Sequence, residues 1–418
     1  MPSDTTPLSI FLSCGEISGD LYAADLTEEL LRQVPALAGN VWGMMGPRTV
    51  AAGGDAVWSY EELKLMGIAE VLPAVPRLLK LRNRMARSIL ERNPSAVVVV
   101  DSPDFHLSLV KKLRLSGYRG LAVCLVTPTV WAWRSGRTKL LRSCFDICLP
   151  LFSFEHEFLL ERGVASMWTA HPLVEALKGY EAPAELADRY RGERVVALMA
   201  GSRGYDIRYH LTQLIGTAAL LKGDGFLPVF SIAPGLSPPL RRELRERTAG
   251  FESWDGEGRG LMKAALAVAG VSGTVAVEAM LLRRFMVVIY NGRGISWLIA
   301  RALVRIPWIS IPNYLTDGPV YPELLKGEAT PERIVCELRR YLDDPAKKAE
   351  IDRKLEGGRR AMGSARAAIF WAESILNALD GKALSRSRDP EKITGGRGPL
   401  DPNYGDQVVD IDLTGGRS

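Results

Sequence analysis

The stretch "LSIFLSCGEISGD", Leu8 to Asp20, is an apolar run that passes through two glycines into a polar segment. The run is typical of a buried β-strand, and the residues from Asp20 to Val34 predict the helix that follows. We expect Gly15 and Gly19 to let a bound molecule approach the backbone closely. Ser18 or Asp20 could cap the helix, whose free N–H groups suit an anion. A single turn of this kind is equally compatible with an ordinary strand-to-helix connection.

The alternation of strand and helix recurs along the chain and restarts halfway. Further buried strands are predicted at residues 96–101, 121–126, 194–200, 227–233, 265–271 and 285–290. The polar segment from Lys178 to Tyr190 separates the two series, so we place a linker there. The pattern predicts an α/β fold with two Rossmann-like, doubly wound domains facing a cleft, and ligands at the carboxyl ends of both sheets.

The domain boundaries follow from these patterns. We expect one domain at residues 1–177, a second at 186–360, and a helix at 361–380 that packs on the first domain or on a partner subunit. Residues 381–418 are rich in glycine, proline, serine, arginine and aspartate, and we expect a disordered tail.

The composition indicates a globular protein and does not favour nucleic-acid binding, although a local basic patch could still matter. Of the 418 residues, 47% are hydrophobic and 24% charged, and the net charge is only +5. No apolar stretch reaches the ~18 residues of a membrane span, and we expect no signal peptide before the first strand. The five cysteines lack the spacing of a zinc site, so we expect reduced thiols in the cytosol.

Two loops in the second half suit phosphate groups, and the first is "AGSRG" at residues 200–204. Gly201 opens the backbone there, and Ser202 offers a hydroxyl. Arg203 can bind a phosphate through two hydrogen bonds. On its own, the motif is also typical of an exposed turn that contains an arginine.

The second loop, "VSGTVAVEAM" at residues 271–280, ends a strand and begins a helix. Ser272, Gly273 and Thr274 place hydroxyls and free N–H groups at the helix N-terminus, which suits a diphosphate. Glu278 lies one turn beyond Thr274 on the same face, where a carboxylate could hold a ribose diol. The two loops together favour a nucleotide diphosphate, with a purely structural role as the alternative.

The first half carries two carboxylates where a buried strand ends. Asp101 closes "AVVVVD", and Asp104 follows in "SPDFH". Either could act as a general base whose pKa depends on its surroundings, or could start a turn. Farther along, Trp131 and Trp133 stand beside Arg134. This combination suits a sugar or acyl group with a phosphate, or a loop packed on the core.

A basic helix is predicted between Val71 and Leu90. Its leucines are interspersed with basic residues and, from Arg77 to Arg87, no acidic residue interrupts them. This composition is typical of a helix on an anionic lipid surface, and also of a solvated basic face. His171, close to the domain junction, is expected to have a structural role.

Taken together, these motifs resemble the lipid-A-disaccharide synthase family, the bacterial GT-B glycosyltransferases of lipid A biosynthesis. The matching motifs occur in order at residues 15–20, 66–72, 101–106, 127–137, 201–204, 272–278 and 310–315. The resemblance implies an inverting hexosyltransferase that joins UDP-2,3-diacylglucosamine to 2,3-diacylglucosamine 1-phosphate and releases UDP. It implies no metal or other cofactor, because the UDP-sugar donor is a substrate.

The resemblance also implies roles for individual residues. Asp101 matches the general base, and Glu16 matches an acidic position that contacts the acceptor or the donor sugar. Asn313 matches an active-site position for which we expect donor contact. Arg203 and the helix start at Thr274 would offset the charge of the leaving diphosphate. The first domain would then serve the acceptor and lipid side, and the second would bind the UDP-sugar.

The family pattern further implies a homodimer with exchanged C-terminal helices. It implies a cytoplasmic protein at the anionic inner leaflet of the inner membrane, from which it takes acylated glucosamine lipids. The chain departs from the pattern at Cys14, His106, Ala170, Ala200 and Lys326; His106 stands at an asparagine position. Two alternatives therefore stay open: another UDP-N-acetylhexosamine transferase or epimerase of the GT-B class, or a non-catalytic relative that binds UDP or lipid.

Overall fold

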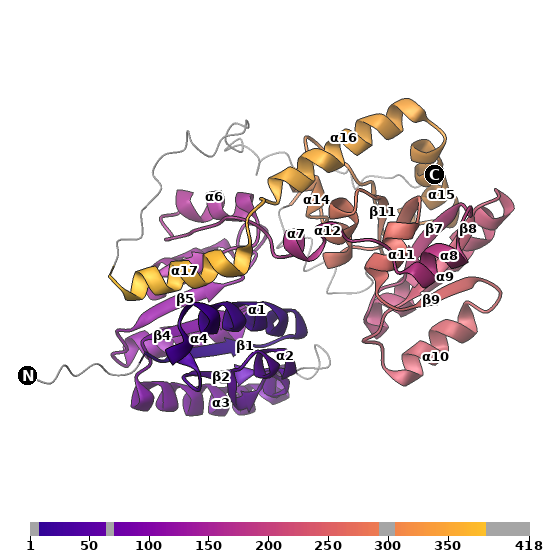
Figure 1. Cartoon of the computed structure of the whole chain (residues 1–418). Helices are drawn as coiled ribbons and strands as arrows, with labels where there is room; N and C mark the ends of the chain where they lie inside the picture. The colour runs from indigo at the N-terminus through magenta and orange to yellow at the C-terminus, as the bar shows by residue number, and fades with distance from the viewer. Residues whose placement is uncertain (1–7, 64–70, 292–305, 382–418) are drawn as a thin grey trace, which may run out of the picture.

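The computed structural model of the chain describes residues 8–63, 71–291 and 306–381. The tail expected to be disordered, from residue 382 onward, and residues 66–70 of the motif at 66–72 lie outside the described residues. The described residues form two α/β bodies that lie side by side, each built on a six-stranded parallel sheet (Figure 1). The predicted GT-B architecture is confirmed.

The first sheet contains the strand predicted at the start of the opening motif and the strands predicted at residues 96–101 and 121–126. Its strands lie in the order β3 (Asp55–Ser59), β2 (Val41–Met45), β1 (Ile10–Cys14), β4 (Ala96–Val100), β5 (Leu121–Leu125) and β6 (Ile147–Leu149). The helices of this body are α1 (Ile17–Gln33), α2 (Pro47–Ala51), α3 (Val71–Arg92), α4 (Pro103–Leu115), α5 (Thr138–Cys144) and α6 (Ser153–Glu161), with short turns η1 (Pro35–Leu37), η2 (Tyr60–Leu63) and η4 (Ser135–Arg137).

Helices cover both faces of this sheet, which is why its central strands are apolar throughout. Successive side chains of β1 point to opposite faces, so Phe11 packs with Met85 of α3 and Leu109 of α4. Leu12 packs on the other face with Leu26 of α1. β1 and β4 are therefore fully buried, and an uninterrupted apolar run was enough to predict them.

The second sheet repeats the arrangement with a single continuous core. Its strands lie in the order β12 (Glu323–Leu325), β11 (Phe285–Tyr290), β10 (Ala267–Val271), β7 (Val195–Met199), β8 (Leu227–Ile232) and β9 (Glu252–Asp255). Its helices are α9 (Gly204–Gly223), α10 (Pro238–Arg247), α11 (Gly258–Ala264), α12 (Thr274–Leu281), α14 (Pro312–Leu315), α15 (Pro331–Leu342) and α16 (Pro345–Ala361), with the turn η5 (Lys326–Glu328).

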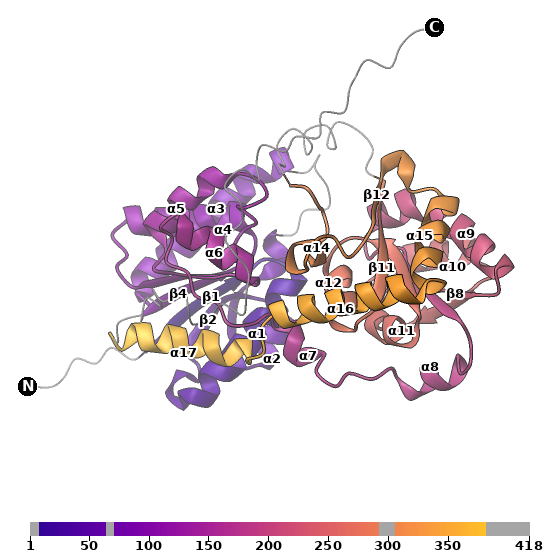
Figure 2. The ribbon, with the colours of Figure 1, turned by 90° about the horizontal axis from the view of Figure 1, so that it is seen from above.

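The chain crosses between the two bodies twice, and the crossings run side by side. The outward crossing carries α7 (Leu173–Ala176) and α8 (Ala184–Arg189), and the return crossing joins α16 to α17 (Ala367–Leu379). The His171 backbone N–H donates to the Met362 carbonyl at 2.9 Å, and Ala170 and Gly363 form an isolated antiparallel bridge. Helices α16 and α17 lie nearly end to end along one side of the molecule (Figure 2).

Helix α17 packs on α1 of its own chain. Trp371 of α17 is 2% exposed, and its ring meets that of Tyr22 edge to face at 6.1 Å. Exchange of this helix with a second subunit stays a prediction.

The strand order places the loops after β1 and β4 next to each other in the first body, and the loops after β7 and β10 next to each other in the second. β1 lies between β2 and β4 in the first sheet, and β7 lies between β10 and β8 in the second. The connections on either side of β1 and of β7 run in opposite directions, so a crevice opens at the carboxyl ends of these strands. The loops after β1, β4, β7 and β10 carry the opening motif, Asp101, Arg203 and Thr274 respectively.

The expectation for the cap of α1 is wrong. The helix begins at Ile17, so Ser18 and Asp20 lie inside it, and its N-cap residue Glu16 makes no side-chain cap. Asp20 instead caps α2. Its buried carboxylate accepts hydrogen bonds from the N–H groups of Gly46, Arg48 and Thr49 at 3.0 to 3.1 Å.

Candidate active site

Asp101 lies at the crevice of the first sheet, directly after β4. Its Oδ1 accepts a hydrogen bond from the Gly15 backbone N–H at 2.9 Å, which joins the loops after β1 and β4. Its Oδ2 is buried and accepts no hydrogen bond from the described residues. Burial raises the pKa of this carboxyl to about 7, and the negative charge of Glu16 adds to the effect. Asp101 can therefore exchange a proton near neutral pH.

The backbone at Asp101 is held in an uncommon conformation. Asp101 and Ser102 have φ values of +56° and +41°, in the left-handed region that non-glycine residues rarely adopt. His106, 1% exposed, lies below this turn and connects it to β1. Its Nδ1–H donates to the Asp101 carbonyl at 2.8 Å, and its Nε2 accepts from the Ser13 hydroxyl at 2.8 Å. Burial lowers the pKa of His106 to about 4, so the ring is neutral.

The two glycines of the opening motif make room for this turn. A Cβ atom on Gly19 would overlap the Asp101 carboxyl, and one on Gly15 would overlap the Ser102 side chain. We expected these glycines to admit a bound molecule. In the structure, the residues directly after β4 occupy this space instead, so Asp101 lies against the first turn of α1.

Glu16 lies beside Asp101 at the mouth of the crevice. It is exposed at the N-cap position of α1, with an extended backbone. Its side chain accepts no hydrogen bond from an N–H group of α1, so the helix does not engage the carboxylate. The structure therefore brings Glu16 and Asp101 together, as the predicted site requires.

Asp104, the second candidate for the base, is engaged by two cations. Arg134 donates to its carboxylate at 3.0 Å, and Arg137 contacts the same oxygen. The Arg134 guanidinium also lies 4.3 Å above the Trp133 ring, which is half-buried. Trp133 and Arg134 thus belong to a cluster on the loop after β5, and Asp101 is left as the carboxylate without a cationic partner.

Trp131 has a structural role, which is the alternative that the sequence left open for this loop. Its indole N–H donates to Glu155 at 2.9 Å, and its ring contacts Tyr314 of the second body at 4.9 Å. Glu155 is buried, which raises the pKa of its carboxyl to about 7. Trp131 therefore joins the two bodies, and no local pattern marks Glu155 as its partner.

In the loop between β7 and α9, Gly201 makes room for the protein's own Asp206. Gly201 has a φ of +99°, and a Cβ atom there would overlap Asp206. Ser202 and Arg203 are exposed, and Arg203 is the N-cap residue of α9. The neighbouring Asp206 faces Arg203 electrostatically, which partly offsets the burial that raises the pKa of this carboxyl.

The neighbouring loop, between β10 and α12, completes this edge of the second sheet. Gly273 adopts φ +150° at the N-cap position, and open space surrounds the place where a Cβ atom would lie. Thr274 is exposed at the first helical position, and the Ser272 hydroxyl donates to the Ile309 carbonyl at 3.4 Å. Because β7 and β10 are adjacent, the Arg203 and Thr274 loops lie side by side.

Glu278 lies one turn into α12, half-buried. Burial raises the pKa of its carboxyl, and the Arg259 guanidinium partly opposes this shift. Both Glu278 and Asp101 act electrostatically on the Tyr22 hydroxyl, whose pKa is raised to about 12 mainly by burial. Carboxylates of both bodies therefore act on this one side chain of α1.

Asn313 is placed differently from the expectation. It is 1% exposed, and its amide N–H groups donate to Tyr321 and Glu323 at 2.9 Å. Its oxygen accepts from the N–H groups of Val320 and Tyr321. All its hydrogen-bonding capacity is used inside the second body, so this geometry does not favour direct contact with a donor.

Glu323 organises the segment around Asn313, and sequence reasoning missed it. Its carboxylate also accepts from the N–H groups of Ile309 and Ser310, at 2.8 and 2.9 Å. Burial raises the pKa of this carboxyl against these hydrogen bonds. Its only sequence signal is an acidic residue at the start of the short strand β12, before two leucines.

No metal centre is evident where the structure describes the chain: no group of three or more His, Cys, Asp or Glu side chains there could hold an ion. In the same ranges, no helix is long and apolar enough to cross a membrane.

Two parallel sheets whose ligand loops meet at facing crevices define the GT-B class of glycosyltransferases and sugar-nucleotide epimerases. Solved structures with the same architecture are similar to this chain. A putative UDP-N-acetylglucosamine 2-epimerase from Listeria monocytogenes has a TM-score of 0.59 at 14% identity and covers 90% of this chain and 97% of its own. The MnaA–UDP co-structure from S. aureus has a TM-score of 0.61 at 12% identity, over 89% of this chain and 97% of its own.

Within this class, the sequence identifies one family. The family model described as Lipid-A-disaccharide synthetase matches residues 10–368. The lipid-A-disaccharide synthase of Myxococcus xanthus (strain DK1622) is 34% identical over 385 residues, which cover 90% of this chain and 98% of that protein. The chain belongs to the lipid-A-disaccharide synthase family and is a glycosyltransferase.

Proposed function

We propose that the protein transfers the sugar of UDP-2,3-diacylglucosamine to 2,3-diacylglucosamine 1-phosphate, with inversion and release of UDP. Family membership supports this reaction. The observation that carries it is the environment of Asp101, a carboxyl at the crevice with a pKa of about 7.

Asp101 is the proposed general base. An inverting transfer needs a group that removes the proton of the acceptor hydroxyl as the new bond forms. A carboxyl with a pKa near the working pH is both ionised enough and basic enough for this step. Oδ1 is held by the Gly15 N–H and keeps a second lone pair for that hydroxyl.

The two loops of the second body are proposed to bind the diphosphate of the donor. Arg203 supplies a guanidinium, and Ser202, Gly273 and Thr274 supply hydroxyl and N–H donors at two adjacent helix starts. These donors offset the charge that develops on the UDP leaving group. In this proposal Glu278 holds the ribose, and no metal or cofactor takes part.

We further propose that the protein works as a homodimer on the cytoplasmic face of the inner membrane. Helix α3 supports membrane contact. Arg77, Lys80 and Arg87 are exposed on its outer face, where Val75 and Leu79 are 39% and 43% exposed. A cationic face with exposed aliphatic side chains suits an anionic bilayer surface.

The test is UDP release by the purified protein given both proposed substrates, with the product identified by mass. We expect disaccharide from the wild type and a rate lower by about two to four orders of magnitude in Asp101→Ala. Asp104→Ala is the matched control and should retain much more activity, because Asp104 is engaged by Arg134. Full activity in Asp101→Ala would refute the assignment of the base, and absence of disaccharide from the wild type would refute the reaction.

A further inference from the structure

A cavity of about 710 Å³ lies away from the candidate active site, beside the two crossings of the chain. Its walls come from α7 and the linker after it, from α11, from the end of α12, and from the last turn of α16 with the return crossing. Residues lining it are Val174, Glu175, Leu177, Lys178, Gly179, Tyr180, Lys263, Leu281, Leu282, Arg283, Arg359, Arg360, Gly363 and Ser364. Because α12 begins at the crevice, its last residue Leu281 lies at the opposite edge of the sheet.

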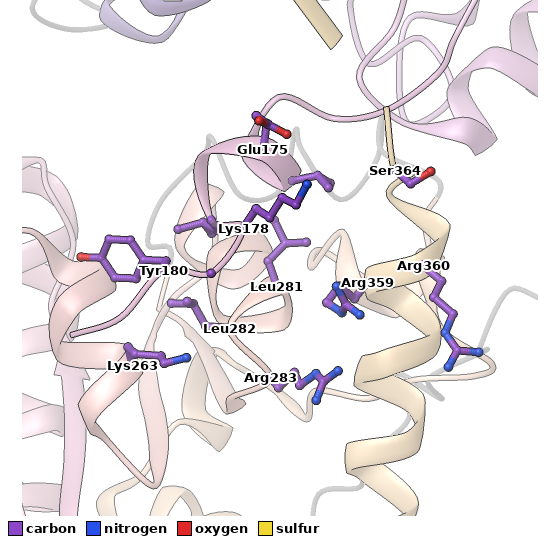
Figure 3. A pocket seen from close by; sticks show the side chains of 14 residues that line it. Glu175, Lys178, Tyr180, Lys263, Leu281, Leu282, Arg283, Arg359, Arg360 and Ser364 are labelled. Carbon is purple, nitrogen blue, oxygen red and sulfur yellow. The ribbon is translucent and has the colours of Figure 1, made fainter. Parts of the chain in front are cut away.

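The charged side chains in this cavity are almost all cationic. Lys178, Lys263, Arg283, Arg359 and Arg360 line it, and Glu175 is the acidic residue among the lining side chains. In Figure 3, Lys263 and Arg283 point into the space between the linker and α16, and Arg359 faces that space from α16. Cations from separate elements therefore converge on one volume.

These cations are incompletely neutralised by the protein. Arg283, Arg359 and Arg360 all contact the single carboxylate of Glu356, and they lower the pKa of that carboxyl to about 2. Lys263 pairs with Glu181 at 3.4 Å, and the ion pairs found among the described residues include none for Lys178. One carboxylate shared by three guanidinium groups leaves positive charge to be balanced by an anion.

Arg283 also occupies a backbone position that favours glycine. It follows α12 with a φ of +57°, and its N–H donates to the Met280 carbonyl, as at a glycine-type helix end. Its side chain is 58% exposed, so packing does not require an arginine there. A strained backbone that presents a cation to a cavity points to a ligand.

We propose that this cavity binds a phosphate-bearing anion. The cationic side chains would bind the phosphate oxygens, and the buried Leu281 and Leu282 form an apolar floor beneath them. The anion bridges the linker, through Lys178, and the end of α16, through Arg359. The bound site therefore ties together the two crossings that connect the bodies.

The test measures binding by calorimetry at about 0.15 M salt, with inorganic pyrophosphate and a short-chain phosphatidic acid as probes. We expect saturable binding of at least one. Tighter binding of pyrophosphate identifies a soluble anion as the ligand class, and tighter binding of the lipid identifies a lipid phosphate. No saturable binding of either probe to the wild type overturns the proposal.

Three variants locate the site. Arg283→Gly removes the cation and relieves the backbone, so it should fold at least as stably as the wild type while binding the probe at least about tenfold more weakly. Arg340→Gln on α15, exposed and paired with Glu337, is the control for lost charge and should bind normally. Arg203→Gln separates this cavity from the proposed donor site. Binding lost in Arg203→Gln but kept in Arg283→Gly would place the anion at the donor site and overturn the proposal.

Discussion

Asp101 has two features that each oppose folding. Its backbone is left-handed, and its carboxyl is buried with one oxygen that accepts no hydrogen bond from the described residues. Each feature typically costs about 1 to 3 kcal/mol. Natural structures retain such costs mainly where function needs them, which supports a chemical role for Asp101 independently of the family match.

The stability of the protein should therefore depend on the protonation of Asp101. Burial raises the pKa of the folded carboxyl from 3.8 to about 7, so its contribution to stability is complete below pH ~4 and is lost as the pH rises through 7. In Asp101→Asn, which stays neutral, we expect a free energy of unfolding on the order of 2 kcal/mol above the wild type at pH 8. The gain should shrink toward pH 4. Urea unfolding at both pH values measures it, and a variant less stable than wild type at pH 8 would contradict it.

His106 should act as a positioning residue for Asp101. In His106→Asn the amide can still donate to the Asp101 carbonyl, so we expect kcat within about threefold of the wild type. In His106→Leu the carbonyl and the Ser13 hydroxyl lose their partner, and we expect kcat to fall about tenfold or more with little change in KM. Steady-state kinetics separates the two parameters. A leucine variant with wild-type kcat would show that His106 only fills space.

At the scale of the element, the start of α1 is shaped by β4. The first turn of α1 presents Gly19 to Asp101, and the preceding Gly15 both contacts Ser102 and donates to Asp101. The helix therefore begins one turn earlier than the polar residues suggest, and Asp20 is directed to the N-terminus of α2. The end of β4 and the start of α2 are therefore both joined to the first turn of α1.

Gly19→Ala tests this packing. No positive φ is required at Gly19, so alanine suits the helix backbone, but its Cβ would overlap the Asp101 carboxyl. We expect activity to fall at least about tenfold, because the displacement of a base by even ~1 Å is costly. Gly223→Ala at the end of α9 meets no atom within 4 Å and is the matched control, with unchanged activity. Equal activities in the two variants would argue against a fixed position for Asp101.

At the scale of the whole molecule, an aromatic contact and two chain crossings connect the bodies. Trp131 packs on Tyr314 across the boundary, and α17 returns to cover α1. The basic face of α3 belongs to the first body, which also carries Asp101. A substrate that reaches the protein from a bilayer bound at this helix would therefore approach the first body.

Membrane binding through α3 is testable with vesicles of anionic lipid. Reversing Arg77 and Lys80 to glutamate should weaken binding at least about tenfold, since each basic residue near such a surface contributes about 1 kcal/mol. The control reverses Lys222 and Arg242, exposed cations of the second body. Flotation at low and at about 0.5 M salt measures both variants, and wild-type binding should weaken in high salt. Equal binding by the two variants would refute a role for α3.

The sequence by itself determined the local structure and the order of the motifs. The buried strands β1, β4, β5, β7, β8, β10 and β11 were predicted, because central strands covered on both faces are continuous apolar runs. The strand β2, "VWGMM", was missed because a central glycine weakens that signal. The glycine loops were also evident, since few other residues suit such turns.

Only the tertiary structure decided which side chains act together. It assigned Asp20 to α2, filled the space at Gly19 with Asp101, and engaged Asp104 with two arginines. It also gave Asn313 a full set of internal partners. The physical reason is that hydrogen bonds, burial and the resulting pKa values depend on atoms far apart in the chain, whereas helix and strand patterns depend on near neighbours.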